Sequence, residues 1–250
     1  GPSTENYYKG PQIGGPVAAL PFEAQVGDGT LTTGYFPFYT LYNYSIAEAL
    51  FLASELEDAG VNRTPMTSLS WYATNAPGYA QQGISIWMAN VSDAALATTS
   101  HVVSGLTLVY TGAMTPAVGW NEFEFNAGSF AWDGQSNILV FCQRNNGTWN
   151  STVYWQSSNA GFTAMSYRYQ DSQAYDVTVP NPMYTTTTRP NTVFKADGRE
   201  YLVGADNVAI DGMTVKGEEG GAHYYLVASS TDADFEVSID VQAIPCPELA

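Results

Sequence analysis

Residues 34–56 carry seven aromatic side chains in 23 residues, and they constrain the fold more than any other part of the chain. Rings of this size stabilise a protein only when other elements remove them from water, so this stretch is predicted to lie in the core. Tyr42, Tyr44 and Ile46 alternate with small or polar residues, which is the period of a half-buried strand. Residues 47–56 also fit a helical turn, but we favour the strand.

After this stretch, short apolar segments recur at regular spacing between polar turns such as Asp133-Gly134. Many short strands with little helical periodicity predict an all-β fold, namely an antiparallel, jelly-roll-like β-sandwich. One helical turn is expected over residues 92–101, with Ser92 or Asp93 as its cap. The predicted strands cover residues 67–72, 83–88, 106–110, 120–125, 138–142, 153–156, 164–169 and 193–203.

Glycine, proline and the strand spacing divide the chain into parts. Residues 1–27 are predicted to form an N-terminal arm whose end is able to pair with the sheet, and residues 28–196 to form the sandwich. A proline-marked loop is expected over residues 179–190. Residues 197–245 add short strands that either extend the sandwich as a β extension or make a small second unit. These strands are predicted at residues 207–210, 213–216, 222–228 and 235–244.

The composition favours an extracellular protein. Hydrophobic residues make up 45% of the chain and charged residues only 13%, while hydroxyl and amide side chains supply the polarity. The 24 acidic and eight basic residues give a net charge of −16, which disfavours nucleic acids and anionic membrane surfaces as partners. No apolar run approaches the ~18 residues of a transmembrane span, so membrane insertion is not expected. Gly1-Pro2 resembles a protease remnant, so a signal peptide is expected to have been removed.

The sequence shows no pattern typical of a catalytic site, and we do not predict an enzyme. It contains neither a Gly-x-Ser-x-Gly nor a His-Glu-x-x-His motif, and His101 and His223 are far apart. Glu122 and Glu124 share one face of a predicted strand, which a glycosidase pair could use. An outer strand face, with the neighbouring phenylalanines pointing inward, is the favoured interpretation.

No cofactor is predicted, and a structural calcium ion is the one metal considered. The acidic loop at residues 231–236, with Asp206 and Asp211, offers part of the oxygen shell that calcium needs, although a solvated acidic turn is the default interpretation. Cys142 lies in an apolar run, so a buried free thiol is favoured over a bridge to Cys246.

A tryptophan in a polar loop is the best candidate for ligand contact. Trp149 lies among asparagines, and a flat ring can stack on the C–H face of a sugar while amides orient its hydroxyls. Covering a sheet edge is the alternative role for Trp149. The predicted ligand-binding residues are Trp149, Asn145, Asn146, Asn150, Tyr79 and Gln81. The predicted core tryptophans are Trp71, Trp87, Trp120 and Trp132, and Tyr154 and Trp155 are expected to point to opposite faces of one strand.

A series of short motifs spreads over residues 30–195. It includes Phe36-Pro37, Tyr42-Asn43-Tyr44-Ser45, Leu69-Ser70-Trp71-Tyr72, Trp132-Asp133-Gly134 and Arg189-Pro190-Asn191. In these motifs and their order the chain resembles a family of β-sandwich modules from secreted, multidomain surface proteins of Bacteroidetes, which are similar to cleaved-adhesin jelly rolls. Cys246-Pro247-Glu248 looks like the start of a fibronectin type III domain, so residues 246–250 are expected to begin a following module.

The resemblance implies surface display with adhesion or glycan recognition, and it does not imply catalysis. We therefore predict a non-catalytic extracellular adhesion or carbohydrate-binding module whose partner is a glycan or a host or neighbouring surface protein. A structural spacer without a ligand is the alternative, and a glycoside-active enzyme is the third hypothesis. Nothing in the sequence specifies an oligomeric state.

Overall fold

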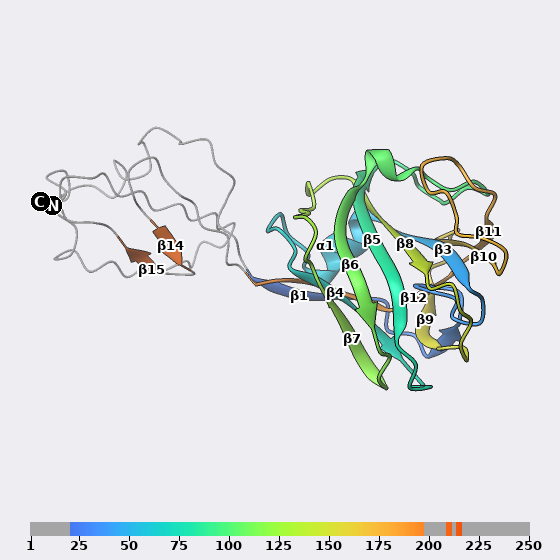
Figure 1. Ribbon diagram of the computed structural model, residues 1–250. Coiled ribbons are helices and arrows are strands. Elements are labelled where there is room, and N and C mark those ends of the chain that lie inside the picture. The colour runs from blue at the N-terminus through green and yellow to red at the C-terminus, as the bar shows by residue number, and fades with distance from the viewer. Residues whose placement is uncertain (1–20, 198–208, 212–213, 217–250) are drawn as a thin grey trace, which may run out of the picture. The chain divides into compact units, whose positions relative to one another are not determined.

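The computed structural model describes residues 21–197, 209–211 and 214–216. Residues 22–197 form one unit with two antiparallel sheets, of seven and six strands, so the predicted antiparallel β-sandwich is confirmed (Figure 1). The jelly-roll connectivity stays a prediction. Strands β14 (Ala209–Asp211) and β15 (Thr214–Lys216) pair with each other as an antiparallel hairpin. The strands predicted at residues 222–228 and 235–244 lie outside the described residues.

The seven-stranded sheet, called sheet A here, has the order β1-β13-β4-β9-β12, and β7 also pairs with β4 and β2 with β9. The end of the predicted arm forms β1, which pairs with β13 from Phe22 to Val26. Sheet A consists of β1 (Phe22–Val26), β2 (Leu31–Thr33), β4 (Ser68–Ala73), β7 (Gly119–Glu124), β9 (Trp155–Asn159), β12 (Thr188–Pro190) and β13 (Thr192–Ala196).

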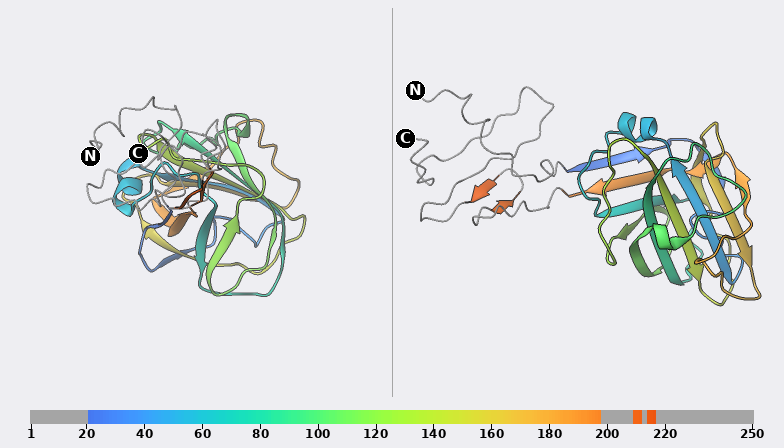
Figure 2. Two further views of the ribbon diagram at one scale, coloured as in Figure 1. Left: turned by 90° about the vertical axis from the view of Figure 1, so that its left-hand side faces the viewer. Right: turned by 90° about the horizontal axis from the view of Figure 1, so that it is seen from above.

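The six-stranded sheet, called sheet B here, has the order β11-β10-β3-β8-β5-β6. Its strands lie side by side in the right-hand view of Figure 2. The loop predicted over residues 179–190 is wrong in its second half, where β11 forms over residues 184–186 and β12 over residues 188–190. Sheet B consists of β3 (Tyr44–Phe51), β5 (Gln81–Val91), β6 (Thr107–Met114), β8 (Asn137–Asn145), β10 (Met165–Gln170) and β11 (Tyr184–Thr186).

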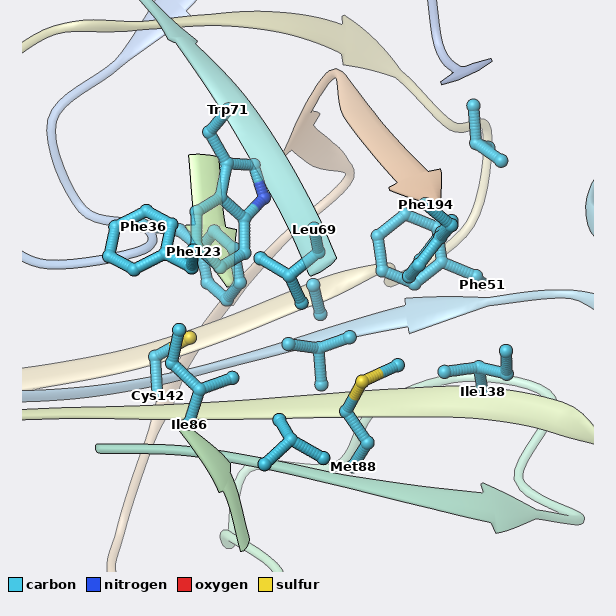
Figure 3. Close-up of a cluster of buried hydrophobic side chains, with 14 of the residues drawn as sticks. Phe36, Phe51, Leu69, Trp71, Ile86, Met88, Phe123, Ile138, Cys142 and Phe194 are labelled. Atoms are coloured by element: carbon cyan, nitrogen blue, oxygen red, sulfur yellow. The ribbon is translucent and has the colours of Figure 1, made fainter. Parts of the chain in front are cut away.

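Aromatic side chains fill the space between the two sheets. Trp71 of β4 meets the rings of Phe36 and Phe123 nearly edge to face, at centroid distances of 5.4 and 5.1 Å (Figure 3). Phe51 of sheet B meets Phe194 of sheet A in the same way, at 4.9 Å. All these rings are fully buried or almost so, and edge-to-face contacts of this kind add to the stabilisation from burial. The aromatic stretch therefore joins the sheets, as the sequence predicts.

Strand β3 is buried on both faces, so the prediction of a half-buried strand is wrong. Ala47, Ala49 and Phe51 face the space between the sheets. On the outer face, Ile46 and Leu50 are covered by side chains from residues 92–106 and 162–183. The outer face of the strand is shielded from solvent because these long connections fold over sheet B.

The predicted helical turn over residues 92–101 is also wrong. Amides in this segment donate to other segments instead: Leu96 N to the oxygen of Thr163, and Ser100 N to that of Asn181. The segment takes its hydrogen bonds from the loops beside it, so a helix does not form. A short 3-10 helix, η2 (Val103–Gly105), follows it.

The α-helix in the described part of the chain is α1 (Ala53–Ala59), which begins just after β3 ends. The favoured strand is thus right up to residue 51, and the helical alternative applies beyond it. Arg189 of β12 holds α1 in place: one guanidinium nitrogen lies 2.7 Å from Glu55, and the group lies 4.2 Å from the centre of the Phe51 ring. Within the described ranges, no helix is long and apolar enough to cross a membrane.

The four tryptophans predicted as core differ in their burial. Trp71 and Trp132 are buried, and Trp87 is half-buried. The prediction is wrong for Trp120, which is 43% exposed and packs edge-on against Tyr72 on the outer face of sheet A. Strand alternation explains this outcome, because Asn121 and Phe123 are the buried positions of β7.

The contact between Phe51 and Phe194 predicts a large stability loss when it is removed. Phe194→Ala should lower the free energy of unfolding by about 3–5 kcal/mol, because it opens a cavity between the sheets. Urea denaturation followed by circular dichroism measures this loss. The control is Val118→Ala, at a site that is 63% exposed, which should change stability by less than about 0.5 kcal/mol. Equal effects of the two changes would contradict this packing.

Candidate functional site

The phenylalanines and the tyrosines of the aromatic stretch differ in how deeply they are buried. Phe36 and Phe38 are fully buried between the sheets, whereas Tyr35 and Tyr39 are only half-buried. A tyrosine ring packs well on one side but keeps a hydroxyl that needs water or a partner. The phenylalanines of the stretch therefore lie in the core, and its tyrosines stay partly exposed at the opening between the sheets.

Tyr35 and Tyr39 line an open hollow of about 330 Å³ between the edges of the two sheets. Sheet A contributes residues of β2 and β12, and sheet B contributes residues of β10 and β11. At Gly34 the chain passes so close to Thr152 that an added Cβ would lie 2.7 Å from the threonine methyl. The lining residues are Thr32, Thr33, Gly34, Tyr35, Tyr39, Thr152, Tyr154, Tyr167, Thr186 and Thr188.

Six tyrosines form a continuous set of ring contacts at this hollow, and we call them the tyrosine array. Tyr35 and Tyr167 are stacked with centroids 4.3 Å apart and planes 2° from parallel, and Tyr39 meets Tyr35 edge-on at 5.0 Å. Tyr169 contacts both Tyr39 and Tyr42, at 4.8 and 4.3 Å. The array consists of Tyr35, Tyr39, Tyr42, Tyr167, Tyr169 and Tyr184. Mutual packing fixes these rings before any ligand arrives, which lowers the entropy cost of binding.

The hollow is lined by hydroxyl groups and carries no charged side chain. Burial, followed by the neighbouring tyrosines, raises the pKa of Tyr39 and of Tyr167 above the ordinary value. These phenols therefore stay protonated at neutral pH and can both donate and accept hydrogen bonds. Flat apolar ring surface and hydroxyls of this kind suit an uncharged ligand that itself bears hydroxyls.

The two loops predicted to carry exposed rings are joined to each other. Trp149 is 62% exposed and Tyr79 is 52% exposed. The Gln81 amide donates to the Tyr79 carbonyl at 3.0 Å and to the Asn150 side-chain oxygen at 3.2 Å. The Asn146 side-chain oxygen accepts from the backbone N–H of residue 82 at 2.6 Å. The structure thus brings the predicted residues together, although the hollow lies elsewhere, among the tyrosines.

A buried arginine organises this loop pair, and the sequence did not single it out. Arg144 is fully buried, and its Nε donates to Gln81 at 2.7 Å. Its terminal nitrogens donate to the carbonyls of Tyr42, Asn43 and Thr148, and to the Asn150 side chain. Burial lowers the pKa of Arg144 to about 10, so it stays charged at neutral pH.

Three of the predicted ligand residues therefore have structural contacts, because the Asn146 side chain also accepts from the backbone N–H of residue 82 and donates to the Thr148 carbonyl at 2.7 Å. Gln81 is fully buried, and both ends of its amide are engaged, with Arg144 on one side and Tyr79 and Asn150 on the other. Asn150 accepts through its side-chain oxygen from Gln81 and Arg144. Asn145 is exposed, at the end of β8. Exposed ring surface on these loops thus belongs to Trp149 and Tyr79.

A second polar cluster is buried on the outer face of sheet B. Glu48 of β3 accepts at one oxygen from the backbone and Nδ1 of His101, at 2.7 and 3.0 Å, and at the other from the Ser166 hydroxyl at 2.7 Å. These residue types also occur in hydrolases, but here the carboxylate is central and both Glu48 and Ser166 are fully buried. The cluster fastens the segment of residues 92–106 to the sheet. An acidic residue inside an apolar strand was its one sign in the sequence.

The acidic pair on β7 lies on an outer face, as the favoured interpretation predicts. Glu122 and Glu124 are exposed, while Phe123 between them is buried. Glu122 accepts from the Ser68 hydroxyl at 2.6 Å and lies 3.5 Å from Lys195 Nζ. Glu122 therefore takes part in the surface contacts of sheet A.

Cys142 is a buried free thiol, as expected, and burial raises its pKa. Cys246 lies outside the described residues. Among residues 21–197 and the hairpin, no group of three or more histidine, cysteine or acidic side chains could hold a metal ion. The acidic loop at residues 231–236 and Asp206 also lie outside the described part, as do the side-chain contacts of Asp211. The calcium alternative therefore stays a prediction.

Comparison with known proteins assigns no family to this chain. No protein-family model matches it, and a search of curated proteins finds no match. The resemblance to surface modules of Bacteroidetes therefore stays a prediction based on short motifs. The geometry of the two ring-bearing regions, the hollow and the joined loops, has to carry any functional argument.

The cluster around Glu48 predicts a pH dependence of stability. The hydrogen bond to Glu48 raises the pKa of His101 above its ordinary value and outweighs burial, which lowers it. Asp93 lies 3.5 Å from the other ring nitrogen and also raises this pKa. The folded state thus favours protonated His101. This stabilisation is complete below the unfolded pKa and is lost as the pH rises through the folded pKa.

Urea titrations between about pH 5 and pH 9 measure the effect. The unfolding free energy should fall with rising pH by at most about 1.4 kcal/mol per pH unit from this one group. His101→Gln should flatten the fall. A slope that persists in His101→Gln would contradict this role.

Arg144 predicts a coupled loss of stability and loop order. Arg144→Met should cost about 3 kcal/mol, since it leaves buried acceptors in three chain segments without their donor. Hydrogen exchange should speed up at the amides of Gln82 and Asn150, which lie in the two joined loops. The control is Arg168→Met, on a half-buried side chain of β10, which should leave these amides protected. Unchanged exchange in Arg144→Met would show that the two loops stay ordered without Arg144, which would contradict this role.

Proposed function

We propose that this chain is a non-catalytic carbohydrate-binding module that binds saccharides in the hollow beside the tyrosine array. One observation carries the proposal: a preformed hollow lined by four tyrosines, five threonines and one glycine, with no charged group. In this proposal the module belongs to an extracellular or surface-exposed protein, as its low charge content favours, and its partner is a glycan.

The chemistry of the lining matches both halves of a sugar. The C–H faces of a pyranose pack against aromatic rings, and its hydroxyls exchange hydrogen bonds with the phenols and threonines. Half of the lining residues are threonines, which add hydroxyls without adding long flexible chains. A proline-rich peptide also packs on tyrosines, but it has no hydroxyls to engage the five threonines. The lining therefore favours a saccharide over a peptide.

The dimensions also suit a small saccharide unit. A volume of about 330 Å³ lies at the lower end of the range of roughly 300–1,000 Å³ for small-molecule sites. The hollow is open to solvent between two sheet edges, so a longer glycan can place its end there while the rest stays outside. Trp149 and Tyr79, exposed on the joined loops, are additional surfaces for such a chain.

A glycan array followed by calorimetry on the tightest saccharide tests the proposal. Tyr154 is 47% exposed and lines the hollow, so Tyr154→Ala should keep the fold and weaken binding at least about tenfold, or about 1.4 kcal/mol. Trp120→Ala, an exposed ring on the outer face of sheet A, is the control and should leave affinity unchanged.

Trp149→Ala separates the hollow from the loop surface. If the hollow is the main site, this change should weaken binding less than Tyr154→Ala does. A larger effect of Trp149→Ala would move the site to the loops. Absence of any bound saccharide would reject the proposal and favour a spacer module without a ligand.

A further inference from the structure

The hollow has a charge property that selects among saccharides. None of its ten lining residues carries a charge, and the chain as a whole carries a net charge of −16. We infer that the site takes neutral saccharides and rejects those that bear carboxylate or sulfate groups. This inference rests on the proposed function and names its ligand class.

Basic residues near a glycan site decide whether an anionic sugar can be paired, and in this unit they are committed elsewhere. Arg144 is buried among the joined loops, and Arg189 is buried against α1. Lys195 lies 3.5 Å from Glu122 on the outer face of sheet A. Arg63 interacts electrostatically with Asp133. His101 lies between Glu48 and Asp93, at 3.0 and 3.5 Å. Within residues 21–197 this leaves Arg168 as the remaining basic side chain.

Arg168 lies close to the array but not in the hollow. Its guanidinium carbon is 4.9 Å from the centre of the Tyr184 ring. Side chains alternate along a strand, so Arg168 points to the face of β10 opposite Tyr167 and Tyr169. An anion in the hollow would therefore meet hydroxyls and ring faces without a cation, after losing part of its hydration.

A cationic ligand is the other charged class to consider, because aromatic rings attract cations. Such a site needs several ring faces turned toward one point. Here Tyr35 and Tyr167 turn their faces to each other, 4.3 Å apart, and leave no space for a ligand between them. The five threonines of the lining also add nothing for a quaternary ammonium group. The array therefore favours an uncharged polyol.

Matched ligands test the inference by calorimetry on the full chain. The tightest neutral saccharide from the array is compared with its uronate, in which one hydroxymethyl group is replaced by a carboxylate. The uronate should bind at least about tenfold more weakly, and the affinity of the neutral saccharide should not change with salt, because no ion pair forms. Choline is titrated as the cationic probe and should not bind.

Two variants make the result decisive. Thr188→Lys places a cation in the hollow and should raise the affinity for the uronate, while Arg168→Gln should change neither affinity. A wild-type preference for the uronate that is lost in Arg168→Gln would overturn the inference while leaving a glycan site in place. Choline binding that is lost in Tyr154→Ala would also overturn it. If no saccharide binds at all, the proposed function fails and the inference fails with it.

Discussion

Edge-to-face packing of aromatic rings between the two sheets is the interaction on which the rest of this structure depends. Phe36, Phe38 and Phe51 come from one segment of the chain and bury their rings against Trp71, Phe123 and Phe194 of sheet A. Burying these phenylalanines fixes the segment, and the segment then presents Tyr35 and Tyr39 at the opening between the sheet edges. The same stretch of sequence thus supplies side chains to the core and to the candidate site.

Much of this arrangement could be predicted from local patterns. Alternation and turn residues were enough for the main strands, and clustered rings were enough to place residues 34–56 in the core. The exposed Trp149 and Tyr79 could be anticipated because polar loops surround them. Trp120 could also have been placed on the outer face from the sequence, because strand alternation puts it on the same side of β7 as the exposed Glu122 and Glu124.

The tyrosine array could not be predicted, because its members come from distant segments. Tyr35 and Tyr167 stack only because β10 lies between β3 and the edge strand β11 in sheet B, which periodicity does not specify. The same holds for Arg144 and Glu48. Each is a buried charged residue that fastens loops to the sheet, and each partner is identified only by the fold. Long-range pairing therefore decides both the shape of the hollow and the order of the loops near it.

The most direct test of the central claim is a nuclear magnetic resonance titration with a neutral saccharide that observes the threonine methyl groups and the tryptophan indole N–H groups. If the hollow beside the tyrosine array is the binding site, the methyl signals of Thr32, Thr186 and Thr188 should shift together and saturate at one affinity. The indole signal of Trp120, on the outer face of sheet A, should stay in place. Shifts confined to Trp149, or none at the three threonines, would contradict the account.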